Sequence, residues 1–338
     1  MTLSLPPLAT TSIGSFPRPT WLAHTKRNQL TFQVVGPTLA EAMDDATILV
    51  LREQEELGLD ILTDGEMRRM SFIFHIAGAW EGVDTQSLVT KEIYRNRVAN
   101  REVPRIYGKI ERHAPAAVAD LTLAKAHTRL PLKVAVPGPM TVVDSSENEF
   151  YDDEAEFAFD VAVALNGELR DLQAAGCAVL QIDEPAMTRY HDKVRAYGAA
   201  ALDRCLDGIT VPTIVHLCYG YPGGGSLQHQ YRYEDLLPEL MTTRIGGFHV
   251  EFGRSTFDAK VLRLCGDRIV VFGCVDPGDS PVPAVEAIER RVGDALEHLD
   301  PRNVWLAPDC GLMTISRGLA HAKLEVMVEA ARRLRAKL

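Results

Sequence analysis

The sequence has 338 residues, of which 46% are hydrophobic and 24% charged, and its formal net charge is −10. This composition is typical of a soluble globular protein with a sizeable core. The acidic balance argues against nucleic acid as a partner, and no apolar run approaches the roughly 20 residues that span a bilayer. The first nine residues do not have the pattern of a secretory signal, and six cysteines are too few for a disulfide scaffold. We therefore expect a cytoplasmic protein with free thiols.

Short apolar runs alternate with longer amphipathic segments from end to end. We expect strands over residues 11–16, 61–65, 132–136, 179–183, 213–218, 247–252, 269–275 and 304–307. We expect helices over residues 39–57, 154–175, 282–299 and 316–334. The strands are rich in Val, Ile and Leu, as in a parallel sheet buried on both faces. The alternation predicts an α/β fold, a (β/α)8 barrel in which residues 1–338 form one domain. A doubly wound sheet is the structural alternative.

Two segments depart from this alternation. Residues 71–113, after the second expected strand, contain two runs of strand-forming residues and are interpreted as a β-hairpin excursion from the barrel. Residues 222–226 are rich in glycine but do not have the spacing of a phosphate-binding loop, so we interpret them as a segment of the barrel rim.

Metal-binding residue types stand at the ends of three expected strands. His216 and Cys218 are two residues apart, so on a strand they point to the same side. Glu251 and Cys310 end two later strands, and in a barrel these ends lie on the catalytic face. One imidazole, two thiols and one carboxylate form a tetrahedral ligand set that suits Zn²⁺. Each residue alone would more simply be a packed core residue, which is how we interpret Cys274.

The charge of this ligand set indicates the chemistry. Zn²⁺ with two thiolates and a carboxylate has a net charge of −1, which makes it a poor Lewis acid. Such a site lowers the pKa of a bound thiol while the sulfur stays nucleophilic. The set therefore favours alkyl transfer to sulfur over activation of water.

Carboxylates also stand at two strand ends. Glu66 follows the second expected strand, and Asp183 and Glu184 end the fourth. One interpretation is that they bind the ammonium group of an amino acid. The alternative is ion pairing with Arg18, Arg68 or Arg69, or helix capping by Glu184. Their position favours function for Glu66 and Asp183, whereas the two interpretations of Glu184 are equally weighted.

At these strand ends the chain resembles the C-terminal catalytic barrel of cobalamin-independent methionine synthase. The matching stretches are residues 11–17, 54–60, 65–66, 138–139, 181–186, 216–219, 251 and 308–312. They cover nearly the whole chain, and their combination is specific although single pieces are weak.

The resemblance implies particular roles for the residues at these positions. It implies that His216, Cys218, Glu251 and Cys310 bind zinc. It implies that homocysteine is bound by the segment Ile13, Gly14 and Ser15 together with Glu66 and Asp183. In that family zinc binds the homocysteine thiol as a thiolate, which takes a methyl group from 5-methyltetrahydrofolate. Asp183 and Glu184 are the candidate catalytic carboxylates.

The chain departs from the family pattern on the side of the methyl donor. At the position where the family has a tryptophan that stacks on the pterin, this chain has the segment 140–145, which contains no tryptophan. After the seventh strand, where the family has a histidine, this chain has the segment 276–279, which contains no histidine. The family's full-length enzyme also has an N-terminal barrel that helps to bind polyglutamyl folate. A methylated corrinoid, free or bound to a protein, or a simple methyl-folate is therefore the expected donor.

Two alternatives remain from the sequence. One is alkyl transfer to another thiol, such as coenzyme M, including epoxide opening. The retained residues 13–15, Glu66 and Asp183 favour an amino-acid thiol, because coenzyme M has a sulfonate and no ammonium group. The other is a non-catalytic protein that binds zinc or an amino acid.

Overall fold

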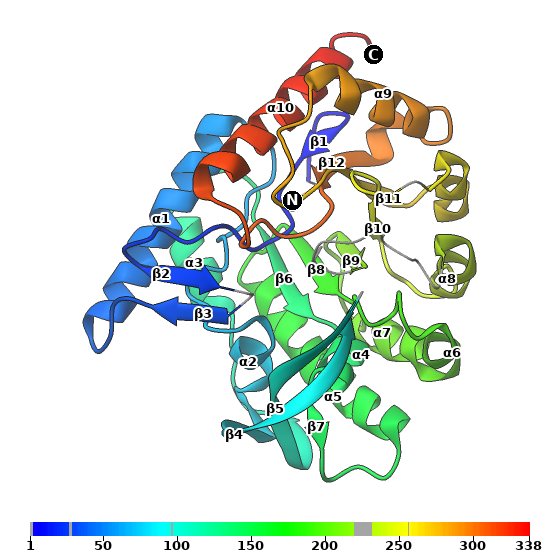
Figure 1. Ribbon diagram of the computed structural model, residues 1–338. Coiled ribbons are helices and arrows are strands. Elements are labelled where there is room, and N and C mark those ends of the chain that lie inside the picture. The colour runs from blue at the N-terminus through cyan, green and yellow to red at the C-terminus, as the bar shows by residue number, and fades with distance from the viewer. Residues whose placement is uncertain (1–2, 27–28, 96, 220–231, 256) are drawn as a thin grey trace. The chain divides into compact units, whose positions relative to one another are not determined.

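The structure is a computed structural model, and it describes residues 3–26, 29–95, 97–219, 232–255 and 257–338 (Figure 1). The expected rim segment 222–226 lies outside these residues. The chain divides into two compact units. The first comprises Met1–Arg69, Asp120–Val134 and Gly247–Leu338, and the second comprises Met70–Ala119 and Ala135–Gly246. Each unit combines helices with parallel strands, so the predicted α/β class is confirmed.

The elements of the first unit come from both ends of the chain. They are β1 (Ala9–Thr10), β2 (Ala23–Lys26), β3 (Gln29–Phe32), α1 (Thr38–Leu57), β10 (Gly247–Glu251), η2 (Ala259–Cys265), β11 (Ile269–Val275), α9 (Val285–Leu296), η3 (Pro301–Asn303), β12 (Val304–Pro308) and α10 (Arg317–Arg335). Two further elements, α3 (Val118–His127) and β6 (Lys133–Pro137), cross a boundary between the units.

Parallel strands form the centre of the first unit. β11 pairs in parallel with β10 on one side and with β12 on the other, and β12 also pairs with β1. Every residue of β10 and β12 is buried, although β10 contains the polar residues His249 and Glu251. The three strands expected over residues 247–252, 269–275 and 304–307 are found with bounds that differ by no more than one residue.

The first two expected strands differ from the structure. The first strand is Ala9–Thr10, so the prediction over residues 11–16 is displaced, and only Thr11 of that range is paired, in a parallel bridge with Ile61. Of residues 61–65, only Ile61 and Leu62 form parallel bridges, so that prediction is too long. At its end Gly65 and Glu66 take left-handed backbone conformations, with φ angles of 65° and 57°, which a strand does not adopt.

The second unit contains the middle of the chain. Its elements are α2 (Phe72–Ala77), β4 (Trp80–Arg95), β5 (Arg97–Arg112), α4 (Pro139–Asp144), β7 (Glu147–Asn148), α5 (Glu154–Ala174), β8 (Val179–Asp183), α6 (His191–Lys193), the π-helix η1 (Val194–Gly198), α7 (Ala199–Cys205), β9 (Thr213–Leu217) and α8 (Tyr233–Leu240). β8 pairs in parallel with β9, and β4 pairs antiparallel with β5. Among the described residues, no helix has the length and apolarity that a bilayer span requires.

Within each unit, parallel strands are neighbours. In the first unit the order is β1-β12-β11-β10, and in the second unit β8 lies beside β9. Parallel pairing places the carboxyl ends of β10, β11 and β12 along one edge of the first unit, and those of β8 and β9 along one edge of the second. Residues that follow these strands are the ones that a site at such an edge would use.

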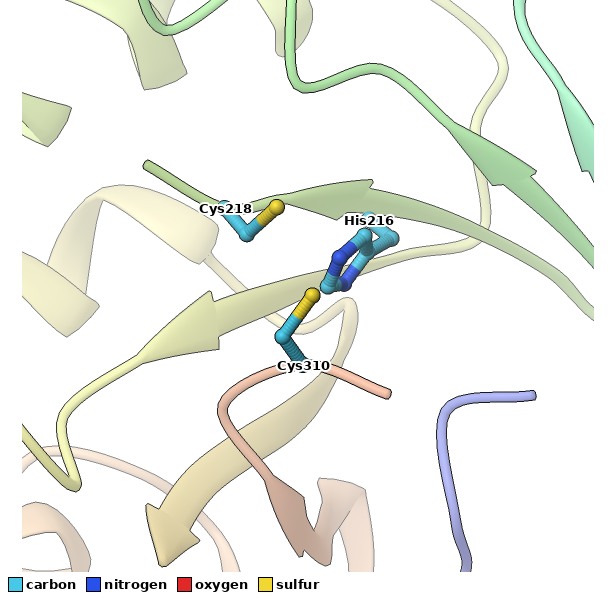
Figure 2. A group of neighbouring side chains, drawn as sticks. All are labelled: His216, Cys218 and Cys310. Atoms are coloured by element: carbon cyan, nitrogen blue, oxygen red, sulfur yellow. The ribbon is translucent and has the colours of Figure 1, made fainter. Parts of the chain in front are cut away.

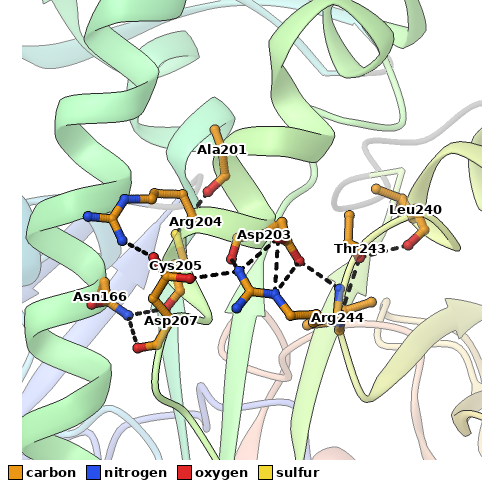
Figure 3. Close-up of polar contacts among 10 residues, drawn as sticks. Asn166, Ala201, Asp203, Arg204, Cys205, Asp207, Leu240, Thr243 and Arg244 are labelled. Carbon is orange, nitrogen blue, oxygen red and sulfur yellow. Dashed lines mark hydrogen bonds and ion pairs between the residues drawn. The ribbon is translucent and has the colours of Figure 1, made fainter.

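Polar contacts fix α7 against α5 and against the loop that precedes β10 (Figure 3). Asn166 of α5 donates hydrogen bonds to the carbonyl oxygens of Cys205 and Asp207, both at 2.8 Å. Arg244 binds the Asp203 carboxylate through Nε and Nη2 and Asp207 through Nη2. Asn166 is buried, whereas the side chain of Arg244 is 54% exposed.

The contacts of Asn166 and Arg244 test whether burial or the number of bonds decides how much a polar side chain stabilises the fold. We predict that Asn166→Ala lowers the free energy of unfolding by about 2 kcal/mol, because one buried and one partly buried carbonyl group lose their donor. Arg244→Ala removes more bonds, yet it should cost less than about 1 kcal/mol, because exposed ion pairs are screened by water. Urea unfolding of both variants measures the difference. A larger loss in Arg244→Ala would contradict this account.

Candidate metal centre and substrate site

Strand β9 positions two of the predicted metal ligands. His216 lies on the strand, Cys218 follows its last residue, and both side chains are buried. The backbone around them is held by three hydrogen bonds. The Glu184 amide donates to the His216 carbonyl at 2.9 Å, the Tyr233 hydroxyl donates to the Leu217 carbonyl at 2.7 Å, and the Thr188 hydroxyl donates to the Cys218 carbonyl at 2.9 Å. These hydrogen bonds fix the main chain that carries the His216 and Cys218 side chains.

Cys310 joins this pair. The ligand atoms of His216, Cys218 and Cys310 all lie within 4.8 Å of one another, and the three residues are buried (Figure 2). One imidazole nitrogen and two thiol sulfurs are ligands that zinc prefers over hard cations such as Mg²⁺. The residues present thus fit a zinc ion, and this His/Cys/Cys group is the candidate metal centre.

Glu251, the fourth predicted ligand, ends β10 and is buried. Its main-chain oxygen accepts a hydrogen bond from the Ser255 hydroxyl at 2.8 Å. Its carboxylate is not one of the three groups that lie within 4.8 Å of one another. The role of Glu251 as a ligand therefore stays a prediction.

The remaining cysteines differ from Cys218 and Cys310. Cys177, Cys205, Cys265 and Cys274 are buried and have free thiols. Burial raises the pKa of both Cys265 and Cys274 to about 12, which keeps these thiols protonated. The Cys274 thiol contacts the carbonyl oxygen of Ala307 at 3.6 Å. These contacts support the interpretation of Cys274 as a packing residue.

The predicted homocysteine segment follows β1. Ile13 and Ser15 are buried, and the carbonyl of Gly14 accepts a hydrogen bond from the Thr63 hydroxyl at 3.0 Å. The carbonyl of Ser15 accepts from the amide of Leu312 at 2.8 Å. The segment 13–15 is thereby attached to the chain just beyond Cys310.

Glu66 has a constrained backbone. It is buried and takes a left-handed conformation, which costs about 1–2 kcal/mol for a residue with a Cβ atom. The Arg18 guanidinium holds this turn by donating to the carbonyl oxygens of Glu66 and Arg69, both at 2.7 Å. The Glu66 carboxylate lies 3.7 Å from the Arg69 guanidinium, so one of the ion pairs considered from the sequence is present.

Asp183 and Glu184 are adjacent but have different surroundings. Asp183 ends β8, and its carboxylate accepts a hydrogen bond from the Gln181 amide at 2.7 Å. Glu184 is fully buried and accepts hydrogen bonds from the amides of Met140 and Thr141, both at 2.9 Å, and from the Thr141 hydroxyl at 2.7 Å. Glu184 thus caps the first turn of α4 rather than a helix that begins at Pro185, while a catalytic role stays a prediction.

Burial and hydrogen bonding oppose each other at the Glu184 carboxyl group. Burial raises its pKa to about 8, and the hydrogen bonds from Thr141 and Met140 lower it. Gly138 leaves the space that the carboxyl group occupies, since a Cβ atom at this position would overlap Glu184. The weak sequence motif at residues 138–139 therefore has a physical reason.

One residue beside the centre had no role in the sequence analysis. Asp309 is buried, and its carboxylate accepts hydrogen bonds from the amides of Phe252, Gly253 and Arg254. Burial raises its pKa to about 7, while these three amides lower it. The only signal in the sequence was its place next to Cys310, because its partners lie more than 50 residues away.

Comparison with known proteins identifies the family of the chain. The family model described as the catalytic domain of cobalamin-independent synthase matches residues 8–333. The chain is 31% identical to the methionine synthases of Saccharolobus solfataricus and Pyrococcus abyssi, over 99% of its length and 97% and 95% of theirs. A B12-independent methionine synthase from Shewanella sp. W3-18-1, solved in complex with selenomethionine, matches with a TM-score of 0.93 and 30% identity over 98% of each chain. A putative vitamin-B12-independent methionine synthase from Listeria monocytogenes shares the fold, with a TM-score of 0.76 and 21% identity.

These matches define a class of enzyme, methyltransferases whose acceptor is a thiol. The chain belongs to the cobalamin-independent methionine synthase family, through its catalytic domain. The resemblance drawn from the motifs at the strand ends is thereby confirmed.

The contact between Gly138 and Glu184 can be tested with one added methyl group. We predict that Gly138→Ala lowers the free energy of unfolding by about 1–3 kcal/mol, because the new Cβ atom displaces the Glu184 carboxyl group. Gly293→Ala in α9 is the matched control. An added Cβ atom there has no neighbour within 4 Å, so the change should stabilise the helix by about 0.5–1 kcal/mol. Equal effects of the two substitutions in thermal unfolding would contradict the assignment.

Proposed function

We propose that this protein transfers a methyl group to the thiol of homocysteine and so forms methionine. The observation that carries the proposal is the buried group of His216, Cys218 and Cys310. Family membership and the methionine synthases to which the chain is similar support the same reaction.

We further propose that His216, Cys218, Glu251 and Cys310 hold Zn²⁺. The donor set supports this assignment, since two sulfurs and one imidazole suit zinc, and Glu251 is a buried carboxylate residue at the end of β10. The bound ion would lower the pKa of the substrate thiol without acting as a strong Lewis acid, because the ligand set leaves a net charge of −1.

The amino-acid part of homocysteine is assigned to the segment 13–15, Glu66 and Asp183. The carboxylates of Glu66 and Asp183 are both buried and are suited to an ammonium group, which they would orient through charge-assisted hydrogen bonds. The Arg18 contacts to the Glu66 turn keep that carboxylate in place before substrate binds. Asp183 and Glu184 remain the candidate catalytic carboxylates.

The transfer itself is an in-line displacement at carbon. The substrate sulfur, having lost its proton, attacks the methyl carbon and forms a new S–C bond, while the bond from the methyl group to its donor breaks and leaves its electron pair on the donor. Exclusion of water favours this step, because a desolvated thiolate is a stronger nucleophile.

The methyl donor is proposed to be a methylated corrinoid or a simple methyl-folate rather than a folate polyglutamate. The segment that replaces the pterin-stacking tryptophan is α4, whose Met140, Thr141, Val142 and Val143 are buried and contain no aromatic ring. The segment 276–279, which stands where the family has a histidine, follows β11. Lys323 holds it by donating hydrogen bonds to the carbonyl oxygens of Asp276 and Gly278.

A complete (β/α)8 barrel, formed by residues 1–338 as one domain with 71–113 as a hairpin insertion, is part of the same proposal. The parallel bridges from Thr11 to Ile61 and from Leu62 to Leu132 support it, since they continue parallel pairing from β1 towards β6. The antiparallel pairing of β4 with β5 supports the hairpin.

Removing a proposed sulfur ligand should remove the metal. We expect about one Zn²⁺ per chain in the wild-type protein, and near none in Cys218→Ser or Cys310→Ser. Methionine formation from homocysteine, with methylcobalamin, a methylated corrinoid protein or methyltetrahydrofolate as donor, should be lost in both variants. Cys274→Ser is the matched control and should keep its metal. Normal zinc content and turnover in the Cys218 and Cys310 variants would refute the metal assignment.

The homocysteine assignment predicts a separate effect. Glu66→Gln and Asp183→Asn should each raise the KM for homocysteine by about 10–100-fold, because each loses a charged hydrogen bond worth about 1.5–3 kcal/mol. Zinc content should not change. Coenzyme M, tested as a competing acceptor, should remain a poor substrate for the wild-type protein. An unchanged KM in both variants would contradict the assignment of the homocysteine ammonium group to Glu66 and Asp183.

A further inference from the structure

The carboxylate of Asp309 binds three consecutive backbone amides. Its Oδ1 atom accepts from Phe252 at 3.1 Å and from Gly253 at 2.7 Å, and its Oδ2 atom accepts from Arg254 at 2.8 Å. Successive amides that converge on one anion form a strong and specific contact, because each N–H dipole points at the charge. All these residues belong to the first unit.

The two ends of this contact are adjacent to two proposed metal ligands. The amides follow directly after Glu251, and Asp309 directly precedes Cys310. A second contact lies nearer the amino ends of the two strands, where Nε2 of the His249 imidazole is 3.0 Å from the carbonyl oxygen of Pro308. The ends of β10 and β12 are therefore joined before and after Glu251, through the two residues that directly precede Cys310.

The strand between them provides the space for this contact. Gly273 of β11 is paired with Glu251 on one side and with Ala307 on the other. A Cβ atom at Gly273 would lie 2.5 Å from Oδ1 of Asp309 and 2.8 Å from the carbonyl oxygen of Val250. Only glycine allows the Asp309 carboxylate to cross β11 and reach the far loop.

We propose that Asp309 is a positioning residue, which sets the separation of Glu251 and Cys310 so that both can bind the same metal ion. This inference rests on the proposed metal site. Asp309 itself is not a ligand, because its two oxygen atoms are already engaged with amides. A planar peptide bond joins it to Cys310, so fixing Asp309 restricts where the Cys310 thiol can lie.

The sharpest variant is Asp309→Asn. It keeps the size of the side chain and one acceptor oxygen, but it places an NH₂ group against an amide donor. We expect its zinc affinity, measured by competition with a chromophoric chelator, to fall by about 10–100-fold. The sulfur-to-metal absorption bands of the cobalt-substituted protein should also change. Gly273→Ala should produce the same two effects without altering Asp309.

The control is Asp300→Asn, at the other end of β12. Asp300 also accepts a backbone amide, from Arg302 at 2.9 Å, but it is exposed and far along the strand from Cys310. Its zinc affinity should match that of the wild-type protein. Circular dichroism of the metal-free proteins should be the same for all variants, because the contact serves the metal ligands rather than the fold.

Two results would overturn the inference. One is wild-type zinc affinity in both Asp309→Asn and Gly273→Ala. The other is failure of these variants to fold without metal, which would make Asp309 a residue of the fold. Failure of the proposed function is a different result, in which the wild-type protein binds no zinc or Cys310→Ser binds it normally.

Discussion

A single buried carboxylate connects the ends of two strands that the chain makes more than 50 residues apart. Asp309 reaches across β11 to the amides after β10, and a histidine on β10 meets the carbonyl oxygen at the end of β12. Parallel strands have no tight turn to join them, so their ends need contacts of this kind. The proposed four-ligand zinc site would depend on this constraint, because Glu251 and Cys310 are the residues next to the two ends of the contact.

Buried charged side chains also bind the main chain near the residues proposed to bind homocysteine. Arg18 holds the left-handed turn at Glu66 through two carbonyl oxygens, and Glu184 caps the helix that begins after Gly138. In each case a buried charged group is bound to the main chain. Such contacts are costly to leave incomplete, so they define one arrangement of the loops that follow the strands. Loops that are rigid before substrate binds lose less entropy when they bind it.

Much of this arrangement could be predicted from the sequence, for physical reasons that differ between elements. Strands such as 179–183 and 269–275 are rich in Val, Ile and Leu or Phe, and they were predicted with their observed bounds. The strand predicted over 11–16 was found at Ala9–Thr10, and the strand before Gly65 was predicted too long, because the left-handed conformations of Gly65 and Glu66 override apolar character there. His216, Cys218 and Cys310 were predicted as ligands because their residue types are rare together and stand at strand ends. The roles of Glu184 and Asp309 were not accessible, since their partners lie 43–57 residues away. Neither propensity nor periodicity carries that information.

Zinc-edge X-ray absorption of the purified protein, with and without homocysteine, tests the central claim most directly. The account predicts two sulfur neighbours at about 2.3 Å in the free protein and a third when homocysteine is added. Selenohomocysteine should give a selenium neighbour instead, which separates the substrate from Cys218 and Cys310. A metal environment that does not change on adding the substrate, or one without sulfur, would contradict the claim that this site binds and activates a thiol.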